Sequence, residues 1–339
     1  MKFFNKKPYL IAEIGVNHNG SLPLALKSIE QAAKSGADAV KFQMFNTEEF
    51  MSDKKINYKY KTKKGFKSEN MFKMFKRLEF SDKWLKKILY TCKKHKVDFL
   101  SSVADIKTAD LVNRLKVKAI KLSSEDLINY PLVEYVASLR RKTILSTGMA
   151  DENEIKRAIG YFKKFKTPFI LLHCVSVYPT PDEETNLLRM VSLSKKFKTQ
   201  VGFSDHTIGI QASIAAVILG AAVIEKHFTL SKNLVGPDHQ LSMDPKEFKS
   251  LHDNVKKAQI ILGNKSILPS KTEKKTKKIF RRSVTALKNI KKGEKYSKYN
   301  ICLKRPANGL HPKYLNFLLG KKAKINIKIN SKIQKKHFI

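Results

Sequence analysis

The 339-residue sequence is poor in cysteine and has no long apolar run, and both shortages exclude classes of protein. Its three cysteines, Cys92, Cys174 and Cys302, lie far apart, without the spacing of a zinc site or a disulfide framework. No run of about 18 apolar residues could span a membrane, and residues 1–10 lack the apolar stretch of a signal peptide. We therefore expect a reduced, cytoplasmic protein with no membrane partner.

Acidic residues are also scarce: 29 Asp and Glu oppose 68 Lys and Arg, which gives a formal net charge of +39. Such a charge is typical of nucleic-acid-binding proteins. However, the lysines are spread over every segment, arginines are few, and platforms of stacked aromatic and arginine side chains are absent. We therefore expect no nucleic-acid partner, and expect the charge to attract small anions. A non-enzymatic polyanion-binding protein is the alternative, and it predicts an affinity that falls with salt.

What the sequence does have is a regular alternation of strand-like and helical segments. Strands are expected at residues 9–14, 38–43, 97–101, 118–122, 142–146, 168–173, 200–203 and 222–226. A helical pattern follows each of them, after a long lysine-rich excursion at residues 46–80 in the case of the second. Eight such units favour an α/β fold, a closed (β/α)8 or TIM barrel. The alternative is an open doubly wound sheet, which usually has a GxGxxG turn that residues 15–20 do not match.

The composition changes after Gly263, which predicts a second domain. Residues 1–263 are predicted to form the catalytic barrel, and the lysine-rich residues 264–278 a linker. Residues 279–339 are predicted to form a small β-rich domain, with strand-like runs at 283–287, 300–303 and 323–329 and a turn at 291–294.

Polar residues gather at the carboxyl ends of the expected barrel strands, where barrel enzymes place their active sites. They are Glu13, Lys41, Gln43, Ser102, Lys121, Ser124, Ser146, Ser176, Tyr178, Ser204, His206 and His227. The lysines and serines could bind a phosphate and a carboxylate, and Glu13 could act as a base. The two histidines, on adjacent strands, could share one divalent metal. Other interpretations stay open: the histidines could be packing residues, the lysines could point outward, and Lys121 could form a Schiff base.

The sequence around these residues resembles the sialic acid (nonulosonic acid) synthase family. The matching motifs are AEIGVNHNG at 12–20, KFQ at 41–43, ILSTGM at 144–149, LLHC at 171–174, GFSDHTIG at 202–209, EKHFT at 225–229 and GPDH at 236–239. Residues 283–294 and Lys304-Arg305-Pro306 are similar to the family's C-terminal antifreeze-like (SAF) domain. The resemblance covers nearly the whole chain.

The resemblance implies a transferase that condenses phosphoenolpyruvate with an N-acylated mannosamine-type sugar and water, giving a nine-carbon 2-keto acid and phosphate. It implies a domain-swapped homodimer and a divalent ion held by His206 and His227, with Mn²⁺ favoured and Mg²⁺ or Co²⁺ as alternatives. The catalytic residues would be Glu13, Lys41 and Lys121. The substrate-binding residues would be Gln43, Ser102, Ser124, Ser146, Ser176, Tyr178, Ser204, Asp238 and Arg305, the last delivered into the partner subunit's site. The alternative is a Schiff-base lyase that uses Lys121.

Some positions depart from the family pattern. Val103-Ala104 replaces a usual Pro-Phe, Ser123-Ser124-Glu125 replaces Gly-Ser-Gly, and Ala307 replaces a glycine. All three are expected near the substrate. The sequence therefore predicts the reaction but leaves the sugar open: N-acetylmannosamine or a diacetamido-trideoxyhexose.

Overall fold

The chain divides between Gly263 and Asn264 into two compact units. The computed structural model describes residues 7–338; residues 1–6 of the predicted first domain, and residue 339, lie outside the described residues. No helix in the described part combines the length and the apolar character that crossing a membrane requires.

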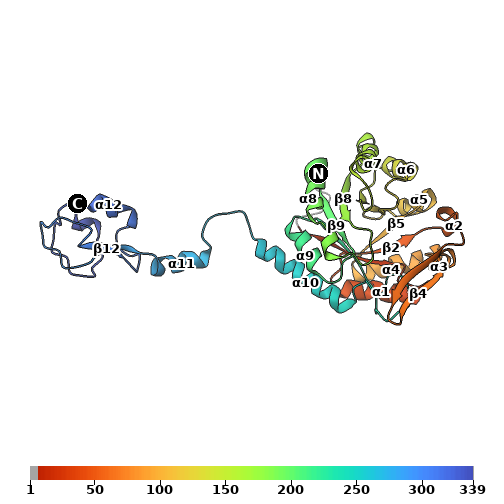
Figure 1. Ribbon diagram of the computed structural model, residues 1–339, viewed down its shortest axis with the longest axis horizontal. Coiled ribbons are helices and arrows are strands. Elements are labelled where there is room, and N and C mark those ends of the chain that lie inside the picture. The colour runs from red at the N-terminus through yellow and green to blue at the C-terminus, as the bar shows by residue number, and fades with distance from the viewer. Residues whose placement is uncertain (1–6, 339) are drawn as a thin grey trace. The chain divides into compact units, whose positions relative to one another are not determined.

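The first unit is a closed barrel of parallel strands, which confirms the predicted (β/α)8 fold (Figure 1). Around the barrel the strands follow the order β1-β10-β9-β8-β7-β6-β5-β2. Their bounds are β1 Tyr9–Gly15, β2 Ala39–Met44, β5 Asp98–Val103, β6 Ile120–Leu122, β7 Thr143–Ser146, β8 Phe169–Cys174, β9 Val201–Asp205 and β10 Val223–His227. All of β1, β6, β7, β9 and β10 is buried, as expected for strands covered on both faces.

Helices connect the strands and cover the outside of the barrel. They are α1 Leu22–Lys34, α4 Leu85–His95, α5 Ile106–Arg114, α6 Tyr130–Ser138, α7 Glu152–Lys164, α8 Leu188–Phe197, α9 Gln211–Ile218 and α10 Pro245–Leu262. The local sequence explains where several helices begin. Asp105, Asp151 and Asp244 are each the N-cap of a helix and form a capping box. These caps satisfy backbone N–H groups that would otherwise lack partners.

The lysine-rich excursion between β2 and α4 is folded rather than irregular. It contains α2 Thr47–Phe50, the antiparallel hairpin β3 Asn57–Thr62 and β4 Gly65–Asn70, helix α3 Met71–Leu78 and the short 3-10 turn Asp82–Trp84. Tyr60 on the hairpin packs with Met74 and Leu78 of α3 in a small core of their own. This segment supplies a wall of the pocket described below.

Alternation along the strands sorts side chains between two layers. One apolar layer fills the inside of the barrel and consists of Tyr9, Ile11, Ala39, Leu100, Ala119, Ile144, Ile170, Leu172 and Val223. A larger apolar cluster lies between the strands and the helices. Because successive side chains of a strand point to opposite faces, the residue two positions after each inner apolar residue also points inward, nearer the carboxyl end. Those positions carry the polar groups of the candidate site.

The second unit begins with a ten-residue helix, α11 Lys271–Phe280, none of whose residues is buried. All but the last two residues of this helix lie in the segment predicted as a linker. The strands β11 Ser283–Ala286 and β12 Ile301–Lys304 pair antiparallel, followed by helix α12 Leu315–Leu318. The predicted strand at 323–329 forms only isolated bridges, such as Ile290 with Ile327, because the turn at 291–294 interrupts its partner segment. A separate apolar core, including Val284 and Tyr296, stabilises this unit.

Candidate active site

Two carboxylates and two ammonium groups lie together inside the barrel at the carboxyl ends of the strands. Lys41 Nζ lies 2.8 Å from Glu13 Oε1 and 3.7 Å from Glu225 Oε1, and Lys121 Nζ lies 3.8 Å from the same Glu225 oxygen. We call these four residues the inner charge cluster. Each stands two positions after an apolar residue of the inner layer, and all four side chains are buried. Burying charges this deeply costs free energy unless they are paired, so the cluster holds itself together by mutual attraction.

Serine hydroxyls surround the cluster. Lys121 donates a hydrogen bond to Ser146 Oγ at 2.8 Å, and Ser204 Oγ donates to Glu225 Oε1 at 3.3 Å. These contacts leave further N–H groups on both lysines. Small hydroxyl groups and ammonium groups in one buried space are well suited to binding an anion with several oxygens.

Gly148 allows two further serines to converge. Its backbone N–H donates to Ser124 Oγ at 3.0 Å. A Cβ at this position would lie 2.4 Å from Ser176 Oγ and 2.8 Å from Ser124 Oγ, so a side chain here would displace both hydroxyls. The turn after β7 thus needs glycine because hydroxyls approach its backbone closely.

The carboxylates of the cluster have unlike electrostatic environments. Burial raises the pKa of Glu13, and the charge of Glu225 raises it further, against the attraction of Lys41. Burial would also raise the pKa of Glu225, but Lys121 and Lys41 hold it below its usual value. One oxygen of each carboxylate, Glu13 Oε2 and Glu225 Oε2, is buried without a hydrogen-bond partner. A group poised to exchange a proton, beside a fixed charge, is the arrangement that acid–base catalysis uses.

The two histidines lie side by side at the ends of β9 and β10. The ring centroids of His206 and His227 are 5.5 Å apart, and the ring of Tyr178 lies 4.1 Å from that of His206. His206 Nδ1 lies 2.8 Å from the carbonyl oxygen of Val175, so its Nε2 is left for another partner. His227 Nδ1 has no hydrogen-bond partner and lies 3.8 Å from Asp238 Oδ2.

The imidazole of His227 is held neutral. Burial lowers its pKa well below the usual value, and the charges of His206 and Lys41 lower it further. A neutral buried imidazole with a free nitrogen is a good metal ligand. No group of three or more His, Cys, Asp or Glu side chains in the described residues is arranged around one metal position. The pair would therefore leave the remaining coordination positions to water or substrate.

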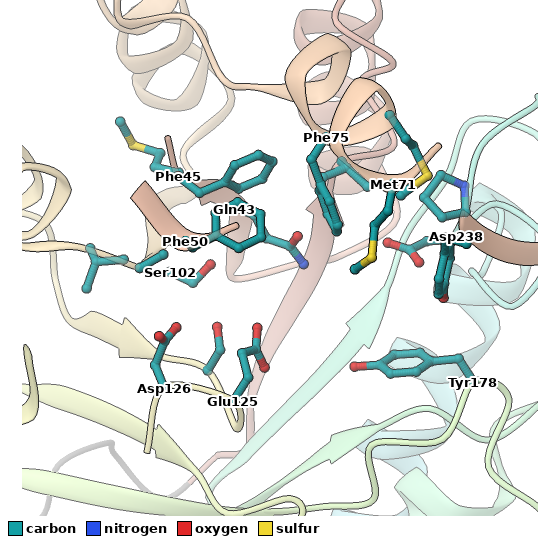
Figure 2. Close-up of a pocket in the computed structure, with 18 of the residues that line it drawn as sticks. Gln43, Phe45, Phe50, Met71, Phe75, Ser102, Glu125, Asp126, Tyr178 and Asp238 are labelled. Atoms are coloured by element: carbon teal, nitrogen blue, oxygen red, sulfur yellow. The ribbon is translucent and has the colours of Figure 1, made fainter. Parts of the chain in front are cut away.

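A pocket of about 290 Å³ opens at this end of the barrel, and all of its lining belongs to the first unit. Gln43, Ser102, Tyr178, His227 and Asp238 contribute polar lining. Figure 2 shows Tyr178 and Asp238 on one side of it, with Gln43 near the middle. Gln43 Nε2 donates to Glu13 Oε1 at 3.0 Å, which links the pocket to the inner charge cluster.

The structure brings the sequence-predicted site residues of the barrel to one end of it and places Arg305 in the second unit. There the Arg305 guanidinium lies 5.7 Å from the ring centroid of Phe280. The site residues predicted from the sequence do not include Glu225. The signal was present: Glu225 stands two residues before His227, so the two must share a face.

A closed parallel barrel with a buried polar centre at its carboxyl end defines the class: a (β/α)8-barrel enzyme. The chain belongs to the NeuB family, whose model matches residues 28–267, and the SAF domain model matches residues 281–339.

Named relatives cover nearly the whole chain. It is 45% identical to the N,N'-diacetyllegionaminic acid synthase of Campylobacter jejuni, over 95% of this chain and 98% of that protein. It is 38% identical to the pseudaminic acid synthase of the same species, over 98% of this chain and 97% of that protein. The crystal structure of an N-acetylneuraminic acid (sialic acid) synthetase from Leptospira borgpetersenii superposes with a TM-score of 0.72 at 34% identity, covering 80% of this chain and 90% of that one.

Proposed function

We propose that the protein is a nonulosonic acid synthase, a transferase that condenses phosphoenolpyruvate with an N-acylated mannosamine-type sugar and water. The products are a nine-carbon 2-keto acid and inorganic phosphate. One observation supports the proposal: two buried lysines with a serine hydroxyl lie beside a carboxylate of raised pKa, in a family whose named members are synthases of such acids.

Phosphoenolpyruvate would bind at the inner charge cluster. Lys41 and Lys121 offset the charge of its phosphate and carboxylate, and the hydroxyls of Ser124, Ser146 and Ser204 donate hydrogen bonds to its oxygens. Because the site excludes water, each of these contacts is worth more than it would be at the surface.

The reaction then needs one carbon–carbon bond and one water. C3 of phosphoenolpyruvate attacks the aldehyde carbon of the open-chain sugar, and the electron pair of the carbonyl moves to its oxygen, which takes a proton. Water adds to the positively charged C2 while Glu13 orients it and accepts its proton. The hemiketal phosphate loses phosphate and becomes the 2-keto acid. No step uses a lysine as a nucleophile.

We also propose that His206 and His227 hold a divalent metal, Mn²⁺ in preference to Mg²⁺ or Co²⁺. The free nitrogen of His227 and the backbone-anchored His206 support this. When bound, such an ion supplies Lewis-acid polarisation of the sugar's carbonyl. Asp238, beside His227, would position the sugar's polar groups.

The direct test is phosphate release from phosphoenolpyruvate with a panel of N-acylated amino sugars. We expect sugar-dependent release, absent in Glu13→Gln. Absence of phosphate with every sugar, together with trapping of Lys121 by borohydride and a nonulosonic acid, would instead identify the Schiff-base lyase.

We further propose a domain-swapped homodimer, in which Arg305 serves the partner subunit's barrel. Mixing and refolding the inactive variants Glu13→Ala and Arg305→Ala should restore activity to about a quarter of wild type, because half of the dimers are mixed and each has one complete site. No recovery in demonstrated mixed dimers would contradict the exchange.

A further inference from the structure

The sugar pocket has two chemically different sides. Figure 2 shows Phe45, Phe75 and Met71 along one side, with Ser102, Glu125 and Asp126 opposite them. Phe50, Tyr58 and Met74 complete the apolar side. A ligand that fills this pocket therefore needs an apolar surface on one side and hydrogen-bond donors on the other.

The apolar side is a built wall rather than a chance exposure of hydrophobic residues. The rings of Phe45, Phe50 and Phe75 contact one another pairwise, with centroids 5.3 to 5.5 Å apart and interplanar angles of 80° to 88°. Such edge-to-face contacts fix the rings before a ligand arrives. Phe50 is nevertheless 42% exposed in the described structure, which leaves apolar surface for a ligand to cover.

The polar side offers acceptors. Glu125 and Asp126 are carboxyl groups that follow β6 and line the pocket. The oxygens of a carboxyl group accept hydrogen bonds, so they pair with N–H or O–H groups of a ligand. An acetamido group matches both sides of the pocket, because it carries an N–H donor for the acceptors and a methyl group for the apolar wall.

Small side chains line the pocket at one point. Val103 ends β5 and Ala104 follows it, and both contribute to the lining. The small Ala104 side chain leaves space that an aromatic ring would fill.

The geometry points to a diacetamido-trideoxyhexose, rather than N-acetylmannosamine, as the sugar. This inference rests on the proposed synthase function. The aldehyde must lie near His227 and the inner charge cluster, so the remote end of the sugar faces the wall of Phe45, Phe50 and Phe75. A 6-methyl group and a second acetyl methyl bury favourably against these rings, whereas a 6-hydroxyl that faces them loses its water and gains no hydrogen-bond partner from the wall.

The test compares kcat/KM for 2,4-diacetamido-2,4,6-trideoxymannose and N-acetylmannosamine, measured by phosphate release at saturating phosphoenolpyruvate. We expect a preference of about 100-fold for the trideoxy sugar, since an apolar pocket discriminates one or two small groups by that order. Equal use of the two sugars, or preference for N-acetylmannosamine, overturns the inference while leaving the synthase intact. No phosphate with either sugar overturns the proposed function instead.

Two variants test whether the wall of Phe45, Phe50 and Phe75 causes the preference. Phe75→Ser should lower the ratio of kcat/KM for the trideoxy sugar to kcat/KM for N-acetylmannosamine about tenfold. Ala104→Phe should lower the same ratio, because the added ring fills space in the pocket. Phe66→Ser is the control, because Phe66 lies on β4, just before α3, is 70% exposed and is outside the pocket lining. Equal losses for both sugars in both variants would contradict a role in selectivity.

Discussion

Two adjacent residues of β10 carry buried charges that face opposite sides of the barrel wall. Glu225 points into the barrel and joins the inner charge cluster, whereas Lys226 points outward and pairs with Asp205 at 2.9 Å. Both members of this outer pair have further hydrogen-bond partners. Lys226 Nζ also donates to the carbonyl of Thr207 at 2.6 Å. Ser213 Oγ and the backbone N–H of Thr207 donate to the two carboxylate oxygens of Asp205.

The inner cluster is not closed in this way. Glu13 Oε2 and Glu225 Oε2 have no hydrogen-bond partner, and neither has His227 Nδ1 at the same end of the barrel. Both sites are equally hidden from water. Burial alone therefore does not distinguish the two sites. The unpartnered oxygens of the inner cluster do, because each leaves an acceptor position that a ligand can satisfy. Substitutions on the two faces should accordingly separate activity from stability.

The largest effect is expected from removing the metal from the inner face. Chelation should abolish phosphate release and Mn²⁺ should restore it best, and His227→Ala should lose at least about a thousandfold of kcat/KM with little change in melting temperature. His95→Ala, a histidine of α4, is the control. Full activity of His227→Ala in metal-free buffer would exclude a metal at this position.

The next effect concerns the anion site. Lys121→Met should lower kcat/KM for phosphoenolpyruvate about 100- to 1,000-fold, because truncating a buried charge partner leaves the ligand's anion unpaired. Lys118→Met is the matched control, since Lys118 lies near the start of β6 and pairs with Asp98 at the surface. An affinity for phosphoenolpyruvate within twofold of wild type, measured by calorimetry, would mean that the anion binds elsewhere.

A substitution on the outer face should instead lower stability and leave activity nearly unchanged. Lys226→Met leaves the Asp205 carboxylate buried without its cation, and should lower the free energy of unfolding by about 3 to 5 kcal/mol. The folded fraction should keep its activity within threefold. The double variant Lys226→Met with Asp205→Leu should recover much of the loss in urea unfolding. A stable but inactive Lys226→Met would show that the outer pair takes part in the reaction.

The contrast also explains what could be predicted from the sequence. Buried runs at regular spacing and capping residues such as Asp151 and Asp244 are local signals, so the barrel strands and helices were predictable. The wall between β2 and α4 was not, because Tyr58 and Tyr60 alternate with lysines, and the lysines mask the hairpin pattern. Its partner residues in α3 become apparent only through contacts with Tyr60.

For the candidate site, the strand-end rule predicted positions but not orientations. Glu225 and Lys226 are neighbouring charged residues, and a three-dimensional register decides which faces the barrel axis. Pairing of Glu13 with His227 and with Lys41 across β10, β1 and β2 settles it. The unsatisfied oxygens of Glu13 and Glu225 follow from packing and have no sequence signature.

The smallest expected effect lies at the edge of the pocket and depends on pH. Burial and the charge of Glu125 raise the pKa of Asp126 to about 7, from an ordinary value of 3.8. The folded state thus holds this proton more tightly than the unfolded chain does, so the side chain destabilises the fold increasingly as pH rises from about 4 to 7. Asp126→Asn removes the charge and should raise the free energy of unfolding by about 1 kcal/mol at pH 8, with no gain at pH 4. Glu125→Gln should give a smaller gain over the same range, because it removes only one of the two causes. Thermal unfolding without substrate, measured at several pH values, distinguishes this from packing: a gain independent of pH would mean that the amide stabilises the fold by contact alone.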